Sequence, residues 1–190
     1  MGTMTPAGRS TGLPLGTHVR VLPDRPDDRG RLTEVFRRSW DSGVDPIQWN
    51  LVDNEAGVLR GVHVHVRHAD YLLVVTGRAV IGLQDLRRHS PTAGLAAIVE
   101  LDGEARAALV IPPGVAHGFA FPTAGVHLYG VDAYWDPDDE LGCRWDDPDL
   151  HIDWPDRDVR VSERDATAGT LAELLELLDP HQARLYPPPA

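Results

Sequence analysis

The sequence predicts a mainly-β fold, a barrel of short antiparallel strands with a C-terminal α-helix. Three observations support this class. Short apolar or alternating runs recur through the middle of the chain, turn signals separate them, and one stretch near the end has helical period instead. Many short strands at roughly even spacing are typical of an antiparallel sandwich or barrel.

The expected strands follow the apolar runs along the chain. They cover residues 58–66, 71–75, 79–83, 96–101, 107–111 and 126–133. Turn residues stand between them, as in Thr76-Gly77 and Ser90-Pro91. The expected helix has leucines at positions i, i+3, i+4 and i+7, which form an apolar stripe that would pack against the barrel. These leucines are Leu171, Leu174, Leu175 and Leu178.

We expect one domain, residues 17–186, behind a flexible N-terminal tail, residues 1–16, that is rich in Gly, Pro, Thr and Ser. The single cysteine, Cys143, has no partner for an internal disulfide, and the N-terminus lacks a basic-then-apolar secretory pattern. No apolar run is long enough to span a bilayer. These features predict a cytoplasmic protein.

The charge of the chain limits its partners. The net charge of −11 argues against nucleic acid, because binding to a phosphate backbone requires a basic surface. All 18 basic residues are arginines, so a mechanism that depends on lysine is excluded. An anionic small ligand would therefore need a local pocket that arginines make cationic.

Histidines at 63 and 65 give the densest chemical signal. In a strand, residues i and i+2 share a face, so both would face the barrel interior while the alternating valines face away. A surface pair on an edge strand is the alternative, but the valines also need burial. A second patch, residues 112–119, contains a Pro-x-Gly-x-x-His turn that ends at His117.

Together the two patches resemble the two-part signature of cupins. That signature is His-x-His, four residues, an acid, six residues and a glycine, followed by Pro-x-Gly-x-x-His. The matching residues here are His63, His65, Asp70, Gly77, Pro112, Gly114 and His117. The resemblance predicts a cupin or jelly-roll β-barrel. In metal-binding cupins the three histidines and the acid, usually glutamate, hold one divalent ion such as Zn, Fe, Ni or Mn.

Nearly the whole chain also resembles the dTDP-4-dehydrorhamnose 3,5-epimerase family. The order and spacing of the matching stretches make the resemblance specific. They are Asp28-Arg29-Gly30 with Glu34 and Phe36, Gln48 and Asn50, and residues 57–63, 85–87, 90–92, 112–119, 144–148, 152–155 and 162–166. The resemblance implies proton transfer at C3, and also at C5 in some members, beside the C4 ketone of a dTDP-linked 4-keto-6-deoxy hexose in deoxysugar biosynthesis. It further implies a homodimer that needs no cofactor.

The resemblance also implies residue roles. His63 would be the base, oriented by Asp165, and Tyr129 would be the proton donor. Arg29 and Arg60 would bind the diphosphate. The other expected substrate contacts are Glu34, Gln48, Asn50, His65, His117 and Trp135, the last of which would stack on the base.

Two of these roles have plain structural alternatives. The spacing of Ser162 and Asp165 also fits a capping box ahead of the last helix, and Tyr129 could belong to the core.

The sequence departs from the family at two positions of the site. The family's lysine position falls on Asp70, and a carboxylate would repel an enolate; His65 also replaces what is commonly a glutamine. Three alternatives to the epimerase therefore stay open. They are a sugar 3,4-ketoisomerase on the same substrate, a metal-dependent cupin enzyme that uses His63, His65, Asp70 and His117, and a binding module without catalysis.

Overall fold

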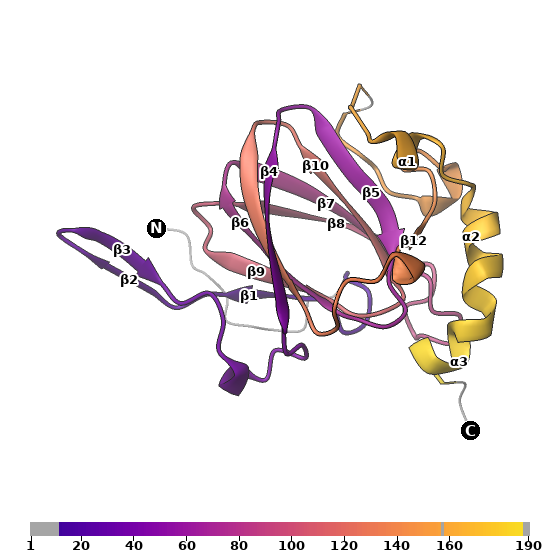
Figure 1. The fold of residues 1–190 in the computed structure, drawn as a ribbon, viewed down its shortest axis with the longest axis horizontal. Coiled ribbons are helices and arrows are strands. Elements are labelled where there is room, and N and C mark those ends of the chain that lie inside the picture. The colour runs from indigo at the N-terminus through magenta and orange to yellow at the C-terminus, as the bar shows by residue number, and fades with distance from the viewer. Residues whose placement is uncertain (1–11, 157, 188–190) are drawn as a thin grey trace.

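The computed structural model describes residues 12–156 and 158–187, which form two antiparallel five-stranded sheets packed face to face (Figure 1). The first sheet has the order β1-β9-β6-β11-β4 and the second the order β12-β5-β10-β7-β8. The strands of the first are β1 (His18–Val21), β9 (Ala107–Ile111), β6 (Asp70–Thr76), β11 (Gly125–Val131) and β4 (Gln48–Asn54). Those of the second are β12 (Leu141–Gly142), β5 (Val58–Val64), β10 (Val115–Phe121), β7 (Arg78–Asp85) and β8 (Ala96–Asp102). This is the predicted jelly-roll barrel.

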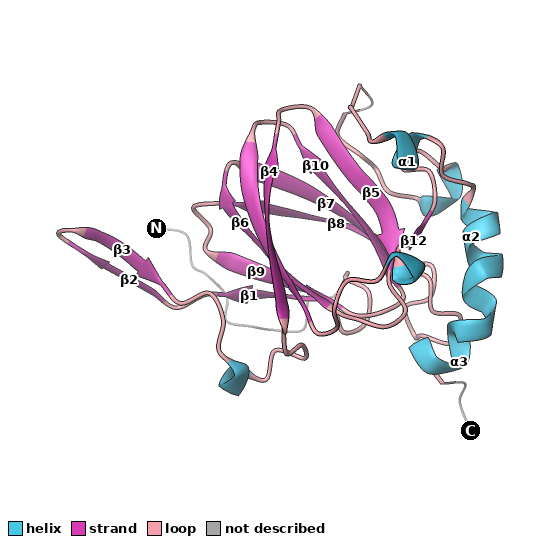
Figure 2. Cartoon of the chain, in the orientation of Figure 1, coloured by secondary structure: helices cyan, strands magenta, loops and turns pink. Residues whose placement is uncertain are grey.

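A hairpin and several short helices lie outside the sheets (Figure 2). The hairpin pairs β2 (Asp24–Asp27) with β3 (Gly30–Thr33) and projects from the barrel. The α-helices are α1 (Glu163–Ala166), α2 (Leu171–Leu178) and α3 (Gln182–Leu185). Single 3-10 turns cover Arg38–Trp40, Pro137–Asp139, Pro148–Leu150 and Asp179–His181. Within the described residues, no helix has the length and apolar character needed to cross a membrane.

The side-chain alternation of β5 places the two histidines as predicted. Val62 and Val64 are buried in the core cluster that also contains Leu171, Leu174 and Leu178 of α2. His63 in β5 and His65, directly after its end, point to the opposite side and line the interior of the barrel. Burial of the valines in this cluster therefore fixes the direction in which both histidines point.

Several strands were not predicted from the sequence, and their burial patterns show why. β10 was expected only as a Pro-Gly turn patch, because it is buried along almost its whole length and lacks an alternating pattern. The strands β1 to β4 were not expected either, and β2 is polar and fully exposed. β5 ends at Val64, two residues before its predicted end, and β11 ends at Val131.

The C-terminal helix α2 forms where the leucine stripe predicts it, but its N-terminal cap differs from the one suggested by the sequence. α2 covers Leu171–Leu178, and its capping box is formed by Thr170 and Glu173. Ser162 instead caps the separate helix α1, where its side chain accepts a hydrogen bond from the backbone N–H of Asp165. The alternative interpretation of Ser162 as a helix cap therefore holds, but for α1 rather than for the last helix.

The predicted tail, residues 1–16, lies partly outside the described residues, which begin at residue 12. Within the described part, Leu15 donates its backbone N–H to the Thr92 hydroxyl at 2.8 Å and accepts from the Arg87 guanidinium at 2.6 Å. The end of the segment is therefore attached to the barrel.

Candidate active site

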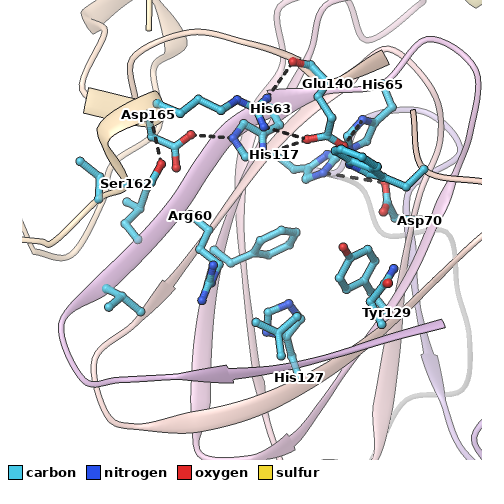
Figure 3. A pocket seen from close by; sticks show the side chains of 18 of the residues that line it. Arg60, His63, His65, Asp70, His117, His127, Tyr129, Glu140, Ser162 and Asp165 are labelled. Carbon is cyan, nitrogen blue, oxygen red and sulfur yellow. Dashed lines mark hydrogen bonds and ion pairs between the residues drawn. The ribbon is translucent and has the colours of Figure 1, made fainter. Parts of the chain in front are cut away.

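A cavity of about 590 Å³ opens between the two sheets (Figure 3). Its walls come from β4, β5, β6, β10 and β11, from the segments around Trp135 and Glu140, and from residues 160–165, which run into α1. Eight of the residues expected in the site line it. They are Asn50, Arg60, His63, His65, His117, Tyr129, Trp135 and Asp165. Residues more than one hundred positions apart in the sequence therefore meet in one pocket.

His63 and Asp165 form a hydrogen-bonded pair at one side of the pocket (Figure 3). The His63 Nε2 atom lies 2.8 Å from Asp165 Oδ1, and the Gly61 backbone N–H donates to Asp165 Oδ2 at 3.3 Å. Burial alone would raise the pKa of Asp165, but the hydrogen bonds and charge from His63 and the Gly61 N–H outweigh it and lower that pKa. A charged Asp165 accepts the Nε2 proton, so Nδ1 of His63 is left as the basic nitrogen.

Tyr129 lies on β11, across the open part of the pocket from Asp165 (Figure 3). Burial raises the pKa of its hydroxyl, and the negative charges of Asp70 and Glu140 act in the same direction. The phenol therefore stays protonated at neutral pH, and it can donate a proton into the pocket.

Arg60 brings positive charge into the pocket from β5. Its Nε–H donates to Asn54 Oδ1 at 2.8 Å, and the Asn54 amide lies 2.9 Å from His127 Nδ1. Burial lowers the pKa of His127 to about 4, and the nearby Arg60 contributes to this shift. His127 is thus neutral at pH 7, and the Arg60 charge remains available to a ligand.

A second group of histidines and a carboxylate lies deeper in the pocket. His65 Nε2 and His117 Nε2 lie 3.9 Å and 3.8 Å from Asp70 Oδ2. Burial lowers the pKa of His65 to about 3 and shifts that of His117 well below its ordinary value. Burial also raises the pKa of Asp70, with Glu140, Asp132 and Asp139 adding to the effect. His63 is not part of this group, and its Nε2 is hydrogen-bonded to Asp165 instead.

Three residues expected in the site lie outside the pocket of this chain. Arg29 is at the exposed tip of the β2–β3 hairpin, where it pairs with Asp27 at 2.5 Å. Glu34 follows β3 and pairs with Arg37 at 2.7 Å. Gln48 lies behind the wall, where its side chain accepts from the Trp135 backbone N–H at 3.0 Å and donates to Asn50 at 3.1 Å. Gln48 thus holds two lining residues without itself lining the pocket.

Among the other lining residues, the sequence analysis did not identify His127, Glu140 and Arg164. His127 is two positions before Tyr129, so strand alternation could have placed it on the same face. Glu140 and Arg164 pair at 3.3 Å but belong to irregular segments or a short helix, where no period indicates which way a side chain points.

The chain is similar to known proteins along most of its length. Residues 16–173 match the family model described as dTDP-4-dehydrorhamnose 3,5-epimerase. An enzyme of that name from Pseudomonas aeruginosa is 36% identical over 159 residues, which are 77% of this chain and 86% of the relative. A dTDP-4-dehydro-6-deoxyglucose 3-epimerase from Streptomyces bikiniensis is 34% identical over 170 residues, 83% of this chain and 86% of the relative.

Solved structures agree with the sequence comparison. The 3,5-epimerase RmlC from Legionella pneumophila, in complex with dTDP-4-keto-L-rhamnose, has a TM-score of 0.79 at 29% identity and covers 92% of this chain and 94% of its own. The 3'-monoepimerase ChmJ from Streptomyces bikiniensis, in complex with dTDP-quinovose, has a TM-score of 0.77 at 32% identity. The match covers 85% of this chain and 87% of the ChmJ chain. The chain therefore belongs to the dTDP-4-dehydrorhamnose 3,5-epimerase family and is an isomerase, a 3- or 3,5-epimerase of dTDP-4-keto-6-deoxysugars.

Proposed function

We propose that this epimerase inverts C3 of a dTDP-4-keto-6-deoxy hexose, with His63 as the base and Tyr129 as the acid. The observation that carries the proposal is the His63–Asp165 hydrogen bond of 2.8 Å at the wall of a pocket that Tyr129 lines from another strand. A base and an acid on different walls are the arrangement that an inversion needs, because the proton must leave one face of the carbon and return to the other.

The proton balance of the reaction follows from these groups. The C4 ketone acidifies the C3 hydrogen, so Nδ1 of His63 takes that proton and leaves an enolate. The Asp165 carboxylate stabilises the imidazolium that forms. The Tyr129 hydroxyl then gives its proton to C3 from the other face, and water restores both groups. Solvent hydrogen therefore ends on C3 in every turnover.

The remaining lining residues support binding of a nucleotide sugar. Arg60 offers a guanidinium to the diphosphate in a protein whose net charge is −11, with Arg160 and Arg164 nearby on the pocket wall. Trp135 is 55% exposed at the pocket and presents a ring on which a base can stack. Asn50, His65 and His117 are proposed to contact the sugar or nucleotide.

The proposal includes a homodimer that works in the cytoplasm. The β2–β3 hairpin carries Arg29 and Glu34 away from the pocket of their own chain, and exchange of an N-terminal strand between two barrels would bring such residues to the partner. Light scattering coupled to size exclusion should then give about twice the 20.8 kDa chain mass, and a monomer would contradict this part of the proposal.

The function is tested by incubation with dTDP-4-keto-6-deoxyglucose in D₂O, followed by NMR and mass spectrometry of the sugar. Deuterium at C3 with an inverted centre is expected, and deuterium at C5 as well would extend the reaction to two centres. Movement of the ketone to C3 would replace the proposal by a ketoisomerase. Binding of dTDP without exchange of hydrogen would indicate a binding module.

A further inference from the structure

We infer that His127 is a further ligand-binding residue of this pocket, and that its Nε2–H donates a hydrogen bond to an oxygen of the nucleotide's diphosphate. His127 lies on β11, two positions before Tyr129, and lines the pocket next to Arg60 (Figure 3). The inference rests on the proposed function, because it takes the ligand to be a dTDP-linked sugar. It adds a neutral hydrogen-bond donor to the arginines proposed above.

The partners of Asn54 settle which way its side-chain amide faces. The Nε–H of Arg60, which can only donate, lies 2.8 Å from Asn54 Oδ1. On the other side of the amide, the backbone carbonyl oxygens of Val52 and Gly125 lie 3.2 Å and 3.3 Å from Nδ2, and a carbonyl oxygen only accepts. Both sets of partners require the same orientation, with the amide oxygen toward Arg60 and the NH2 group toward the carbonyls.

This orientation decides which nitrogen of His127 carries the hydrogen. Asn54 Nδ2 is a donor and lies 2.9 Å from His127 Nδ1, so Nδ1 accepts and carries no hydrogen. A hydrogen on Nδ1 would place two donors against each other at that distance. Burial lowers the pKa of His127 to about 4, with a contribution from Arg60, so the ring is neutral at pH 7. Its single ring hydrogen therefore lies on Nε2.

The Nε2–H of His127 has no acceptor in the part of the chain that the structure describes. The residue is only 2% exposed, although it lines the pocket. Its ring stacks against the rings of Phe121 and Tyr129, with centroid distances of 5.4 Å and 5.8 Å and interplanar angles of 23° and 25°. These contacts and the bond to Asn54 hold the ring in place. An N–H in so enclosed a position is costly to leave without an acceptor, and a ligand oxygen would offset that cost.

The positive charge next to His127 indicates the kind of acceptor. Arg60 and His127 are hydrogen-bonded to the same Asn54 side chain, so their free N–H groups reach the same part of the pocket. Arg60 uses Nε for Asn54 and Nη2 for a contact of 3.4 Å with the Asp53 carbonyl oxygen, and Nη1 makes no hydrogen bond with the described residues. A guanidinium and a neutral donor side by side suit an anion with several oxygens, which a diphosphate provides.

The test compares the binding of dTDP with that of thymidine, which lacks the phosphates. The His127→Phe variant keeps an aromatic ring for the stacking contacts but loses the donor. Calorimetric titration of the full chain should give an affinity for dTDP that is about tenfold weaker in His127→Phe, because hydrogen bonds to charged groups are among the stronger ones. The affinity for thymidine should stay within about twofold of the wild type. The exposed His89 gives a matched control, and His89→Phe should bind dTDP like the wild type.

Two further measurements separate binding from a structural role of His127. Long-range ¹H–¹⁵N correlation spectra distinguish a ring nitrogen with a hydrogen from one with a lone pair, and the signals that His127→Phe lacks identify His127. Nε2 should carry the hydrogen at pH 7. The His127→Gln variant, whose amide can donate, should recover part of the dTDP affinity. Circular dichroism of each variant checks that the fold is retained.

Three results would overturn the inference. The first is unchanged dTDP affinity in a folded His127→Phe variant. The second is an equal loss of thymidine affinity, which would place the acceptor on the nucleoside. The third is a hydrogen on Nδ1 instead of Nε2. The proposed function fails separately, if the wild type binds dTDP through His127 but leaves the C3 hydrogen of the keto sugar unexchanged, whereas a wild type that does not bind dTDP would overturn both.

Discussion

Two buried aspartates in one pocket have opposite surroundings. Asp165 and Asp70 are each 5% exposed. Asp165 has His63 Nε2 within 2.8 Å and the Gly61 N–H within 3.3 Å, and its pKa is lowered although burial acts the other way. Asp70 receives no hydrogen bond from the described residues, and burial raises its pKa. The pKa of Asp70 is thus raised by burial and by the negative charges of Glu140, Asp132 and Asp139, whereas hydrogen-bond donors outweigh burial at Asp165.

The difference divides the pocket into two parts. On the Asp165 side, a charged carboxylate is hydrogen-bonded to the imidazole that we propose as the base. On the Asp70 side no such hydrogen bond forms among the described residues, since His65 Nε2 and His117 Nε2 stand 3.9 Å and 3.8 Å from Asp70 Oδ2. Variants on the two sides should therefore differ in their effects on turnover and on stability.

Replacing His63 should have the largest effect. The His63→Ala variant should lower the rate of product formation about 10³-fold or more, since a positioned general base contributes typically 10²–10⁴-fold. Its affinity for dTDP should stay within about twofold of the wild type, because the nucleotide is held elsewhere. Turnover is followed by NMR of the product. The exposed His89 gives a matched control, and a comparable loss in His89→Ala would contradict the assignment.

Replacing Tyr129, which lies toward the Asp70 side, should slow the second half of the reaction (Figure 3). The Tyr129→Phe variant should form product about 10²-fold more slowly, because the donor of the returning proton is lost. Removal of the C3 proton should be slowed less. Rapid-quench measurements of exchange and of product in the same reaction check this. Unchanged product formation would exclude the acid role.

The two aspartates should differ in their effect on stability. Asp165→Asn should lower the free energy of unfolding by about 1.5–3 kcal/mol, the range for hydrogen bonds to charged groups. Asp70→Asn should leave the metal-free protein as stable as the wild type or raise its Tm, because no donor is lost. Urea unfolding of EDTA-treated proteins measures both. A larger loss in Asp70→Asn would reverse the comparison.

The advantage that Asp165 gives the folded protein should depend on pH. The pKa of Asp165 is lowered in the folded state, so this contribution is fully present above the unfolded value near 4. It is lost as the pH falls through the lower, folded value. The difference in unfolding free energy between wild type and Asp165→Asn should therefore be constant from about pH 5 to 7 and narrow below pH 4. A difference that grows on acidification would contradict the lowered pKa.

The positions of His63, His65 and helix α2 could be predicted from the sequence. Alternation in β5 placed His63 and His65 on one face, since three valines needed burial on the other. The leucine stripe gave the bounds of α2 directly. Such features depend on local period, so they are readable without a structure.

Other parts of the site depend on contacts between distant segments. Asp165 meets His63 from 102 positions away, and only the family resemblance pointed to the pair. The projecting hairpin takes Arg29 and Glu34 away from the pocket, which follows from how β2 and β3 leave the barrel and not from their spacing. Asp139 and Glu140 lie in or beside a 3-10 turn without a repeating pattern, so neither their proximity to His65 nor their different partners could be predicted.

Loss of the C3 proton itself tests most directly whether His63 is the base. Wild-type and His63→Ala proteins, both treated with EDTA, are incubated with the 4-keto-6-deoxy sugar nucleotide in D₂O, and the H3 resonance is followed by NMR. We expect the wild type to lose this resonance as deuterium enters C3, and His63→Ala to retain it. Equal loss of the resonance in both proteins would show that another group removes the proton.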